Sequence, residues 1–203
     1  MNWAPPSASN FSGLVDHLSL VLFGIAAFIA LLVLTLLVFF GIRYRAGSKV
    51  DRTNPPEQNL KLEFALIGVI LLVGLGTFFT SAKVFFKMYT PPPDAKTVYV
   101  TAKQWMWEFQ NPEGKNTIND LTVTVNEPVK LTMISEDVIH SLFVPAFRIK
   151  QDVLPGSYTS VWFTPTDVGD YPIYCTQFCG LSHSEMRAMI HVIPARKEVA
   201  HVH

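Results

Sequence analysis

Two long apolar runs dominate the first half of the chain. Residues Leu18 to Ile42 form 25 consecutive positions without a charged side chain, and a second run, Phe64 to Ala82, has 19. At about 1.5 Å rise per residue, a helix over either run is comparable with the roughly 30 Å hydrocarbon layer of a bilayer. The pattern predicts two transmembrane helices. A buried hairpin in a soluble protein is the alternative, but the chain is too short to cover such helices on all sides.

Basic residues are concentrated between these two runs. The connecting segment carries five, and none precedes the first run: Arg43, Arg45, Lys49, Arg52 and Lys61. Because cytoplasmic loops are enriched in Lys and Arg, this segment is expected in the cytoplasm and both termini outside. Residues 1–14 lack the basic start of a secretory signal, and we expect them to form an exposed tail.

The second half of the chain has a different pattern. Tyr89-Thr90-Pro91-Pro92-Pro93 should end the second helix, since proline lacks the backbone donor and disfavours a helical residue before it. This predicts an anchor over residues 1–90 and a second domain over 91–203. Short runs of β-forming residues separated by turn residues then predict an antiparallel sandwich or a Greek-key barrel. The runs are Thr97–Thr101, Gln104–Phe109, Leu121–Val125, Val129–Ser135, Val138–Val144, Tyr158–Phe163, Tyr171–Tyr174 and Arg187–Ile193.

Charge limits the class of partner. The chain has 16 acidic and 16 basic residues, and this balance argues against a nucleic-acid partner. Residues 91–203 hold 12 Asp and Glu against 9 Lys and Arg, so the predicted β domain is mildly acidic. An acidic surface is suited to a basic protein partner.

The candidate chemistry lies near the end of the chain. The spacing Cys175-x3-Cys179-x3-His183-x2-Met186 contains the only two cysteines. Sulfur donors mixed with imidazole favour copper, and two thiolates can bridge two metal ions, which indicates a dinuclear copper site. A second imidazole should then come from elsewhere, and His140 in the apolar run 138–144 is a candidate. The alternative is a disulfide, but it would explain neither His183 nor Met186.

Four motifs in order resemble subunit II of cytochrome c oxidase. They are QWMWEF (104–109), SEDVIHS (135–141), KQDVLPG (150–156) and CTQFCGLSHSEM (175–186), and the first half of the chain resembles the two-helix anchor of that family. The resemblance implies a cupredoxin-like Greek-key domain with a dinuclear Cu(A) centre. Its implied ligands are His140, Cys175, Cys179, His183, Met186 and the backbone carbonyl of Gln177.

The resemblance also implies roles for residues outside the ligand set. Trp105 would receive the electron from cytochrome c, although paired aromatics such as Trp105 and Trp107, which should face one side of a strand, are usually core residues. Acidic residues would form the docking surface: Asp137, Glu108, Glu136 and Asp152. Glu63 would open a proton path into the large subunit, or serve only as a favourable charge at a helix start.

The resemblance implies a subunit of a terminal oxidase. Electrons would pass to haem in subunit I, which also holds a second copper, for reduction of oxygen to water coupled to proton translocation. Subunit III and membrane lipid would be further partners, in a bacterial plasma membrane with the copper domain on the outer side. Many family members have Glu where this chain has Gln177, and an amide is a poorer ligand for magnesium, so the magnesium site of the family is not expected here.

Other functions fit the sequence less well. A quinol-oxidising relative would lack the thiolates. A thioredoxin-type copper-delivery protein would need βαβ patterns, and a binding module with a structural disulfide would leave His183 and Met186 unexplained. A copper-containing nitric oxide reductase would use a similar electron-accepting subunit, so it stays an alternative.

Overall fold

A computed structural model describes residues 5–51, 53 and 58–195. The chain divides into two compact units. One unit contains the amino-terminal residues through Val15 together with the chain from Val84 onward, and the other is Asp16–Lys83. Arg52, Pro55 and Pro56 of the predicted connecting loop lie outside the described residues, as do residues 196–203.

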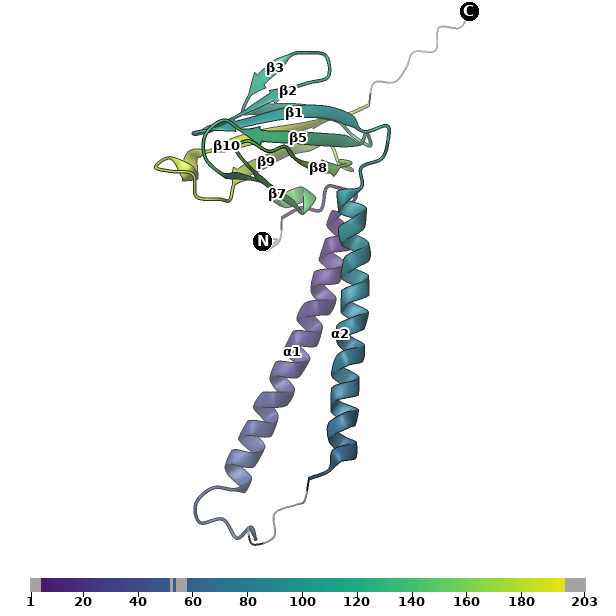
Figure 1. Ribbon diagram of the computed structural model, residues 1–203, viewed down its shortest axis with the longest axis vertical. Helices are drawn as coiled ribbons and strands as arrows, with labels where there is room; N and C mark the ends of the chain where they lie inside the picture. The colour runs from purple at the N-terminus through teal and green to yellow at the C-terminus, as the bar shows by residue number, and fades with distance from the viewer. Residues whose placement is uncertain (1–4, 52, 54–57, 196–203) are drawn as a thin grey trace, which may run out of the picture. The chain divides into compact units, whose positions relative to one another are not determined.

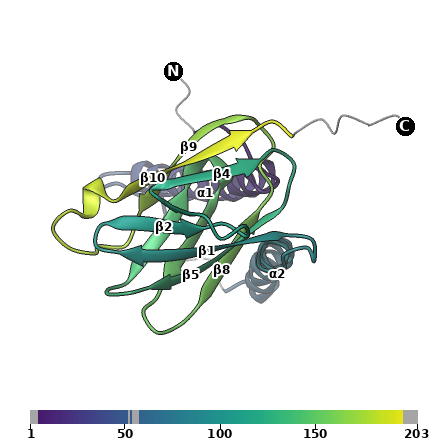
Figure 2. The same cartoon turned by 90° about the horizontal axis from the view of Figure 1, so that it is seen from above.

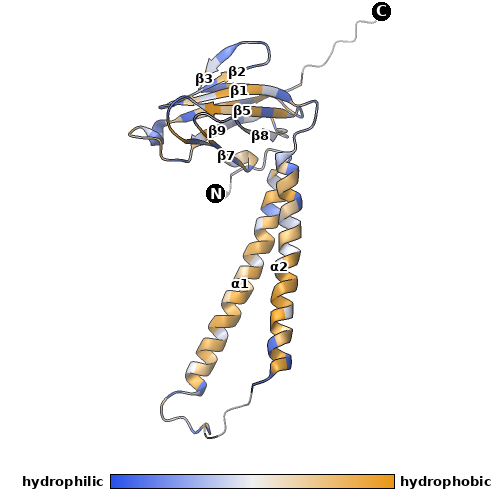
Figure 3. Ribbon diagram, in the orientation of Figure 1, coloured by the Kyte–Doolittle hydropathy of each residue, from blue (hydrophilic) through white to orange (hydrophobic). Residues whose placement is uncertain are grey.

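The two apolar runs form long helices. They are α1 (Ser12–Arg43) and α2 (Leu60–Tyr89), and both extend past the predicted bounds (Figure 1). Apolar residues cover them along most of their length (Figure 3), and none of their most apolar stretch is buried inside the protein. Each is long and apolar enough to cross a membrane. A buried soluble hairpin would instead have its apolar side chains covered, so that alternative is not supported.

The second half folds into two five-stranded sheets (Figure 2). One sheet has the order β3-β2-β1-β5-β8 and the other β4-β10-β9-β6-β7. The strands of the first sheet are β1 (Lys96–Lys103), β2 (Met106–Gln110), β3 (Asn116–Ile118), β5 (Val129–Ser135) and β8 (Thr159–Phe163). Those of the second are β4 (Asp120–Thr124), β6 (His140–Val144), β7 (Ile149–Val153), β9 (Gly169–Cys175) and β10 (Arg187–Ile193).

All eight predicted strand regions contain a strand, but some details were wrong. The sequence did not indicate β3 or β7, which are short strands rich in polar residues. Pairing is not wholly antiparallel, because β1 runs parallel to β5 and β4 parallel to β10. Lys103 pairs with Met106, so Gln104 and Trp105 form the turn between β1 and β2 instead of starting a strand.

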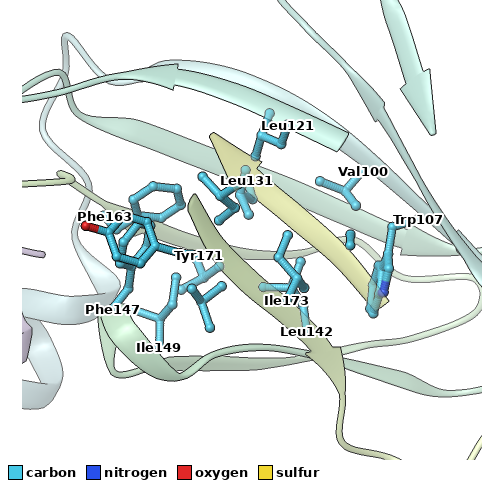
Figure 4. Close-up of a cluster of buried hydrophobic side chains, with 14 of the residues drawn as sticks. Val100, Trp107, Leu121, Leu131, Leu142, Phe147, Ile149, Phe163, Tyr171 and Ile173 are labelled. Carbon is cyan, nitrogen blue, oxygen red and sulfur yellow. The ribbon is translucent and has the colours of Figure 1, made fainter. Parts of the chain in front are cut away.

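The core lies between the two sheets. Alternate residues of each strand point inward, as in β5, where Val129, Leu131 and Met133 are buried and the residues between them are only partly covered. Figure 4 shows side chains from both sheets in contact, together with Phe147 from the short 3-10 helix η1 (Pro145–Phe147). This rigid sandwich supports the loops at its ends.

Part of the amino-terminal segment, Ala8 to Ser12, belongs to this core, so the expectation of an exposed tail was wrong there; residues 1–4 lie outside the described residues. Ala8 bonds through its backbone to Ala146 and Thr166, and Phe11 is fully buried against Trp162 at 4.8 Å between ring centroids. The hydroxyl of Ser9 donates to the carbonyl of Phe147 at 2.8 Å. These partners lie more than 130 positions away along the chain, which explains why no local pattern indicated the burial.

Candidate metal centre

The two cysteines approach each other at one end of the sandwich. Cys175 ends β9, and Cys179 lies in the loop between β9 and β10, which extends beyond the strands in Figure 2. Both thiols are free, and their Sγ atoms lie 3.7 Å apart. A disulfide bond measures about 2.05 Å, so the structure does not contain the alternative cystine. Both side chains are nevertheless buried, which removes water from around the sulfurs.

The first imidazole comes from the neighbouring strand. His140 begins β6, is completely buried, and has its Nδ1 atom 3.9 Å from Cys175 Sγ. Its other ring nitrogen, Nε2, lies 2.8 Å from a carboxylate oxygen of Asp137. When the carboxylate accepts a hydrogen bond from Nε2–H, the other nitrogen, Nδ1, has a free lone pair that faces the thiols. This orientation is the one that a metal-binding histidine needs.

The remaining donors follow Cys179 along the chain. His183 begins the 3-10 helix η2 (His183–Glu185), and its Nδ1 atom is 3.4 Å from Cys179 Sγ. The sulfur of Met186, which is buried, lies 3.7 Å from the same Sγ atom. The carbonyl oxygen of Gln177 is 3.3 Å from Cys175 Sγ. All six donors implied by the family resemblance therefore meet in one place.

The two thiols differ in acidity. Burial raises the pKa of Cys175, but hydrogen bonds with His140 and with the backbone at Ser141 and Gln177 outweigh it and lower the pKa to about 6. Burial raises the pKa of Cys179 to about 12, assisted by the hydrogen bond and the charge of Cys175. In the metal-free protein near neutral pH, Cys175 therefore carries the negative charge and Cys179 keeps its proton. A cation bound at both sulfurs would displace that second proton.

The donor set fits copper. Thiolate, thioether and imidazole are soft or borderline ligands, and four of the donor residues, His140, Cys175, Cys179 and Met186, are buried, unlike the open oxygen-rich sites of magnesium or calcium. The ligand atoms of His140, Cys175 and Cys179 all lie within 4.8 Å of one another, and among the residues that the structure describes no other three His, Cys, Asp or Glu side chains come together in this way.

Trp105 and Trp107 have different surroundings, so the expectation that they face one side of a strand was wrong. Trp107 lies in β2, is fully buried, and packs edge-on to His140 at 6.1 Å between ring centroids. Trp105 lies in the turn and is partly exposed. A Cβ built on Gly180 would be 3.4 Å from Nε1 and Cζ2 of Trp105, so the indole lies against the residue that follows Cys179.

The four predicted docking acids have separate surroundings. Asp137 accepts hydrogen bonds from His140 and from the backbone N–H groups of Gln104 and Val138. Burial alone would raise its pKa, but these bonds hold the pKa of Asp137 below its ordinary value. The other three have other partners: Asp152 accepts from the buried Ser141, Glu136 pairs with Lys103, and Glu108 accepts from Asn116 on β3.

Two residues at the centre had no clear signal in the sequence. The side chain of Gln104 donates to the carbonyl of Cys179 at 2.8 Å, and Gly180 has a positive φ of 116°.

Glu63, the predicted proton-path residue, lies in the first turn of α2 within the other unit and accepts a hydrogen bond from Gln58.

Known proteins resemble this chain along most of its length. Residues 113–193 match the family described as cytochrome c oxidase subunit II, periplasmic domain. The alternative cytochrome c oxidase subunit 2 of Bradyrhizobium diazoefficiens is 28% identical over 224 residues, with 93% of this chain and 78% of the relative covered. Cytochrome c oxidase subunit 2 of Thermostichus vulcanus is 29% identical over 243 residues, with 92% and 73% covered.

A solved structure resembles the β domain. The crystal structure of the periplasmic domain of subunit II of cytochrome oxidase from Bradyrhizobium japonicum is 27% identical, with a TM-score of 0.50, and covers 52% of this chain and 88% of that one. The predicted fold class, a two-helix hairpin followed by a cupredoxin-like β domain, is confirmed. The two apolar helices and the matched domain fit a membrane-anchored subunit.

Proposed function

Since the chain is a cytochrome c oxidase subunit II-like protein, and so an oxidoreductase subunit, we propose that it accepts single electrons from cytochrome c at a dinuclear Cu(A) centre and delivers them to haem in subunit I. The complex would use them to reduce oxygen to water, coupled to proton translocation. One observation supports this proposal above the others: two buried free thiols 3.7 Å apart lie in contact with two imidazole nitrogens and a thioether.

The proposed ligands are side chains held by a rigid scaffold. They are His140, Cys175, Cys179, His183 and Met186, with the main-chain carbonyl of Gln177. Two copper ions held between the thiolates would share one electron, which is the redox chemistry such a centre supplies. His140 and Cys175 are held by the pairing of β6 with β9, and the backbone N–H of Cys175 donates to the carbonyl of Met186, which ties the end of the loop to the same sheet. Fixed donors limit the rearrangement that accompanies a change of charge.

The surrounding residues would prepare the site for this chemistry. Asp137 holds His140 with Nδ1 directed at the sulfurs, and the burial of both thiols excludes water. Trp105 would be the contact point for the donor, because its partly exposed indole lies against Gly180, next to Cys179. Asp137, Glu108, Glu136 and Asp152 would contribute to the field that attracts a basic cytochrome.

The remaining assignments concern partners and location. We propose subunit I, with its haem and second copper, and subunit III as partners in a bacterial plasma membrane, with residues 1–90 as the anchor and 91–203 as the copper domain on the outer side. The basic connecting loop supports this sidedness. Glu63 is proposed at the mouth of a proton path, since α2 would place it toward the cytoplasm. We propose no magnesium site at Gln177.

Copper binding by the full-length protein in detergent tests the proposal. We expect two copper ions per chain and a paramagnetic resonance spectrum in which one unpaired electron couples to both nuclei. The variant Cys175→Ser should lose this spectrum, because one of the two thiolate ligands is gone. A single copper with a four-line hyperfine pattern, or a wild-type protein that takes up no copper, would contradict the proposed centre.

A further inference from the structure

Gln104 connects two parts of the metal centre that are far apart in the sequence. Its backbone N–H donates to Asp137 Oδ2 at 2.7 Å, and Asp137 in turn holds His140. Its side-chain Nε2 donates to the carbonyl oxygen of Cys179 at 2.8 Å. One residue of the β1–β2 turn is therefore bonded both to the carboxylate that orients one donor and to the peptide group of another.

The loop backbone is shaped to receive this side chain. Gly180 follows Cys179 with φ of +116°, a conformation that residues with a side chain rarely adopt. A Cβ at this position would lie 2.8 Å from Gln104 Nε2, which is too close for any real contact. The absence of a Cβ thus lets the Gln104 amide reach the loop backbone.

We infer that Gln104 is a positioning residue for the metal centre, an inference that rests on the proposed function. The amide hydrogen bond holds the peptide plane of Cys179, and the orientation of that peptide limits where Cys179 Sγ can point. The backbone bond to Asp137 fixes the other side of the centre through His140. Gln104 therefore couples the positions of a sulfur donor and a nitrogen donor that come from different segments of the chain.

A second role for Gln104 would predict different behaviour. The side chain is exposed on the same turn as Trp105, so it could instead contact only the electron donor. A contact residue of that kind would change the KM for cytochrome c and leave the metal centre unaltered. A positioning residue should alter the centre in the isolated protein, without any donor present.

The test uses side-chain variants of the full-length protein in detergent. Gln104→Ala removes the amide, and Gln104→Glu keeps its shape but places a carboxylate oxygen against the Cys179 carbonyl. Every non-proline substitution keeps the backbone N–H that bonds Asp137, so these variants isolate the side-chain bond. Gln110→Ala, which alters an exposed glutamine at the other end of β2, is the matched control.

Three measurements are compared across the variants. The first is hydrogen exchange of residues 176–183 in the metal-free protein. The others are the rate of copper release to a chelator and the copper hyperfine pattern after loading. We expect faster exchange in both Gln104 variants and copper release faster by roughly 3- to 10-fold in Gln104→Ala, the range for one net hydrogen bond. Gln104→Glu should show the larger effect and an altered hyperfine pattern, and Gln110→Ala should match wild type.

The outcomes separate this inference from the proposed function. Wild-type exchange, release and spectrum in both Gln104 variants would overturn the positioning role, whether or not the KM for cytochrome c changes. If Gln104→Ala does not fold, Gln104→Glu decides by the same readouts. If wild-type protein binds no copper, the proposed function fails, but exchange in the metal-free loop still tests whether Gln104 holds Cys179.

Discussion

At the residue scale, hydrogen bonds make two chemically identical thiols behave differently. Cys175 is hydrogen bonded to a buried imidazole and to the backbone around it, whereas Cys179 is buried beside the resulting negative charge. Hydrogen bonds also define the roles of two neighbouring side chains. Asp137 acts on the site through His140, and Gln104 acts through the carbonyl of Cys179. Each residue's role depends on the atom it contacts as well as on its type.

The first prediction concerns the thiols of the metal-free protein. Because the pKa of Cys175 is lowered to about 6, its thiolate should persist from neutral pH down to that value, and alkylation should slow as the pH falls below it. Cys179 should react more slowly throughout, because its pKa is about 12. Mass spectrometry of the alkylated peptides at several pH values, with partial denaturation as the control for access, measures both. Equal reactivity of the two cysteines would contradict the assignment.

The second prediction concerns Trp105. Replacement by Ala removes the aromatic surface beside Gly180 and should slow electron acceptance from cytochrome c by roughly tenfold or more, about 1.4 kcal/mol in the barrier. The copper spectrum should stay unchanged, because Trp105 supplies no donor atom. Trp105→Phe should recover part of the rate. Stopped-flow reduction of the intact complex is the measurement, and a wild-type rate in Trp105→Ala would exclude Trp105 from the path.

At the scale of elements, the β domain is completed by residues that precede its strands in the sequence, from the segment before α1 and from the end of α2. The segment before α1 pairs with η1 and with the chain after β8, and the indole N–H of Trp162 donates to the carbonyl of Lys87 in the last turn of α2. The outer ends of both helices are therefore built into the domain that carries the candidate metal centre. A fragment that starts after the second helix would lack the cover of Phe11 over Trp162.

The third prediction tests this segment. Phe11→Ala should lower the free energy of unfolding of the β domain by about 3–5 kcal/mol, because a fully buried aromatic ring leaves a cavity. Tyr158→Ala is the control, since Tyr158 is 67% exposed and its loss should cost little. Thermal unfolding followed by near-ultraviolet circular dichroism compares the two. Equal stability of Phe11→Ala and wild type would show that the segment is dispensable.

The fourth prediction concerns His191, which links three strands of one sheet. Its Nδ1 lies 2.6 Å from Asp170 on β9 and its Nε2 3.1 Å from Asp120 on β4. The hydrogen bond with Asp170, which outweighs the opposing effect of burial, raises the pKa of His191, and the nearby charge of Asp120 adds to the increase. The stabilisation is therefore fully present below the unfolded value of about 6.5 and is lost as pH rises through the folded pKa.

The effect of this residue should be small because it lies at the surface. His191→Gln should lower the free energy of unfolding by roughly 0.5–1 kcal/mol at pH 5.5 and by less at pH 8.5. Denaturant unfolding at the two pH values measures the difference, with Asp170→Asn as the matched variant. A loss that is larger at pH 8.5 than at pH 5.5 would contradict the sign.

At the scale of the whole molecule, an apolar anchor and a water-exposed sandwich share one chain. The helix surfaces carry many exposed apolar side chains, whose exposure to water would be unfavourable, whereas the sandwich buries its apolar side chains between two sheets (Figures 3 and 4). This difference in where the apolar side chains lie explains why the composition changes sharply near residue 90.

The fifth prediction tests the sidedness of the anchor. A cysteine placed by Lys49→Cys in the connecting loop should be labelled by a membrane-impermeant maleimide only after the cells are permeabilised, since basic loops stay in the cytoplasm. Tyr158→Cys in the β domain should be labelled in intact, outer-membrane-permeable cells. Labelling of the wild-type protein, whose two native thiols are buried, gives the background to subtract. Labelling of Lys49→Cys in intact cells would reverse the proposed orientation.

Local patterns in the sequence were sufficient for both helices, for eight of the ten strands that the structure describes, and for a set of candidate metal donors. The apolar runs predicted α1 and α2 because length and hydropathy are properties of one segment, and alternation predicted strands such as β5 and β10 at their observed bounds. The spacing of Cys175, Cys179, His183 and Met186 indicated copper because the ligand chemistry lies within twelve residues. These features need no knowledge of what packs against them.

Tertiary structure decided what depends on residues far apart in the chain. The burial of Phe11, the bond from Gln104 to Cys179 and the acidity of Cys175 beside His140 all arise where two distant segments meet. A hydrogen bond or a packing contact depends on two residues, and the local sequence around one of them does not indicate which distant residue is the other. The sequence alone thus predicted most of its helices and strands and a candidate donor set, whereas the folded sheets determined which atoms face one another at the candidate metal centre and how each is held.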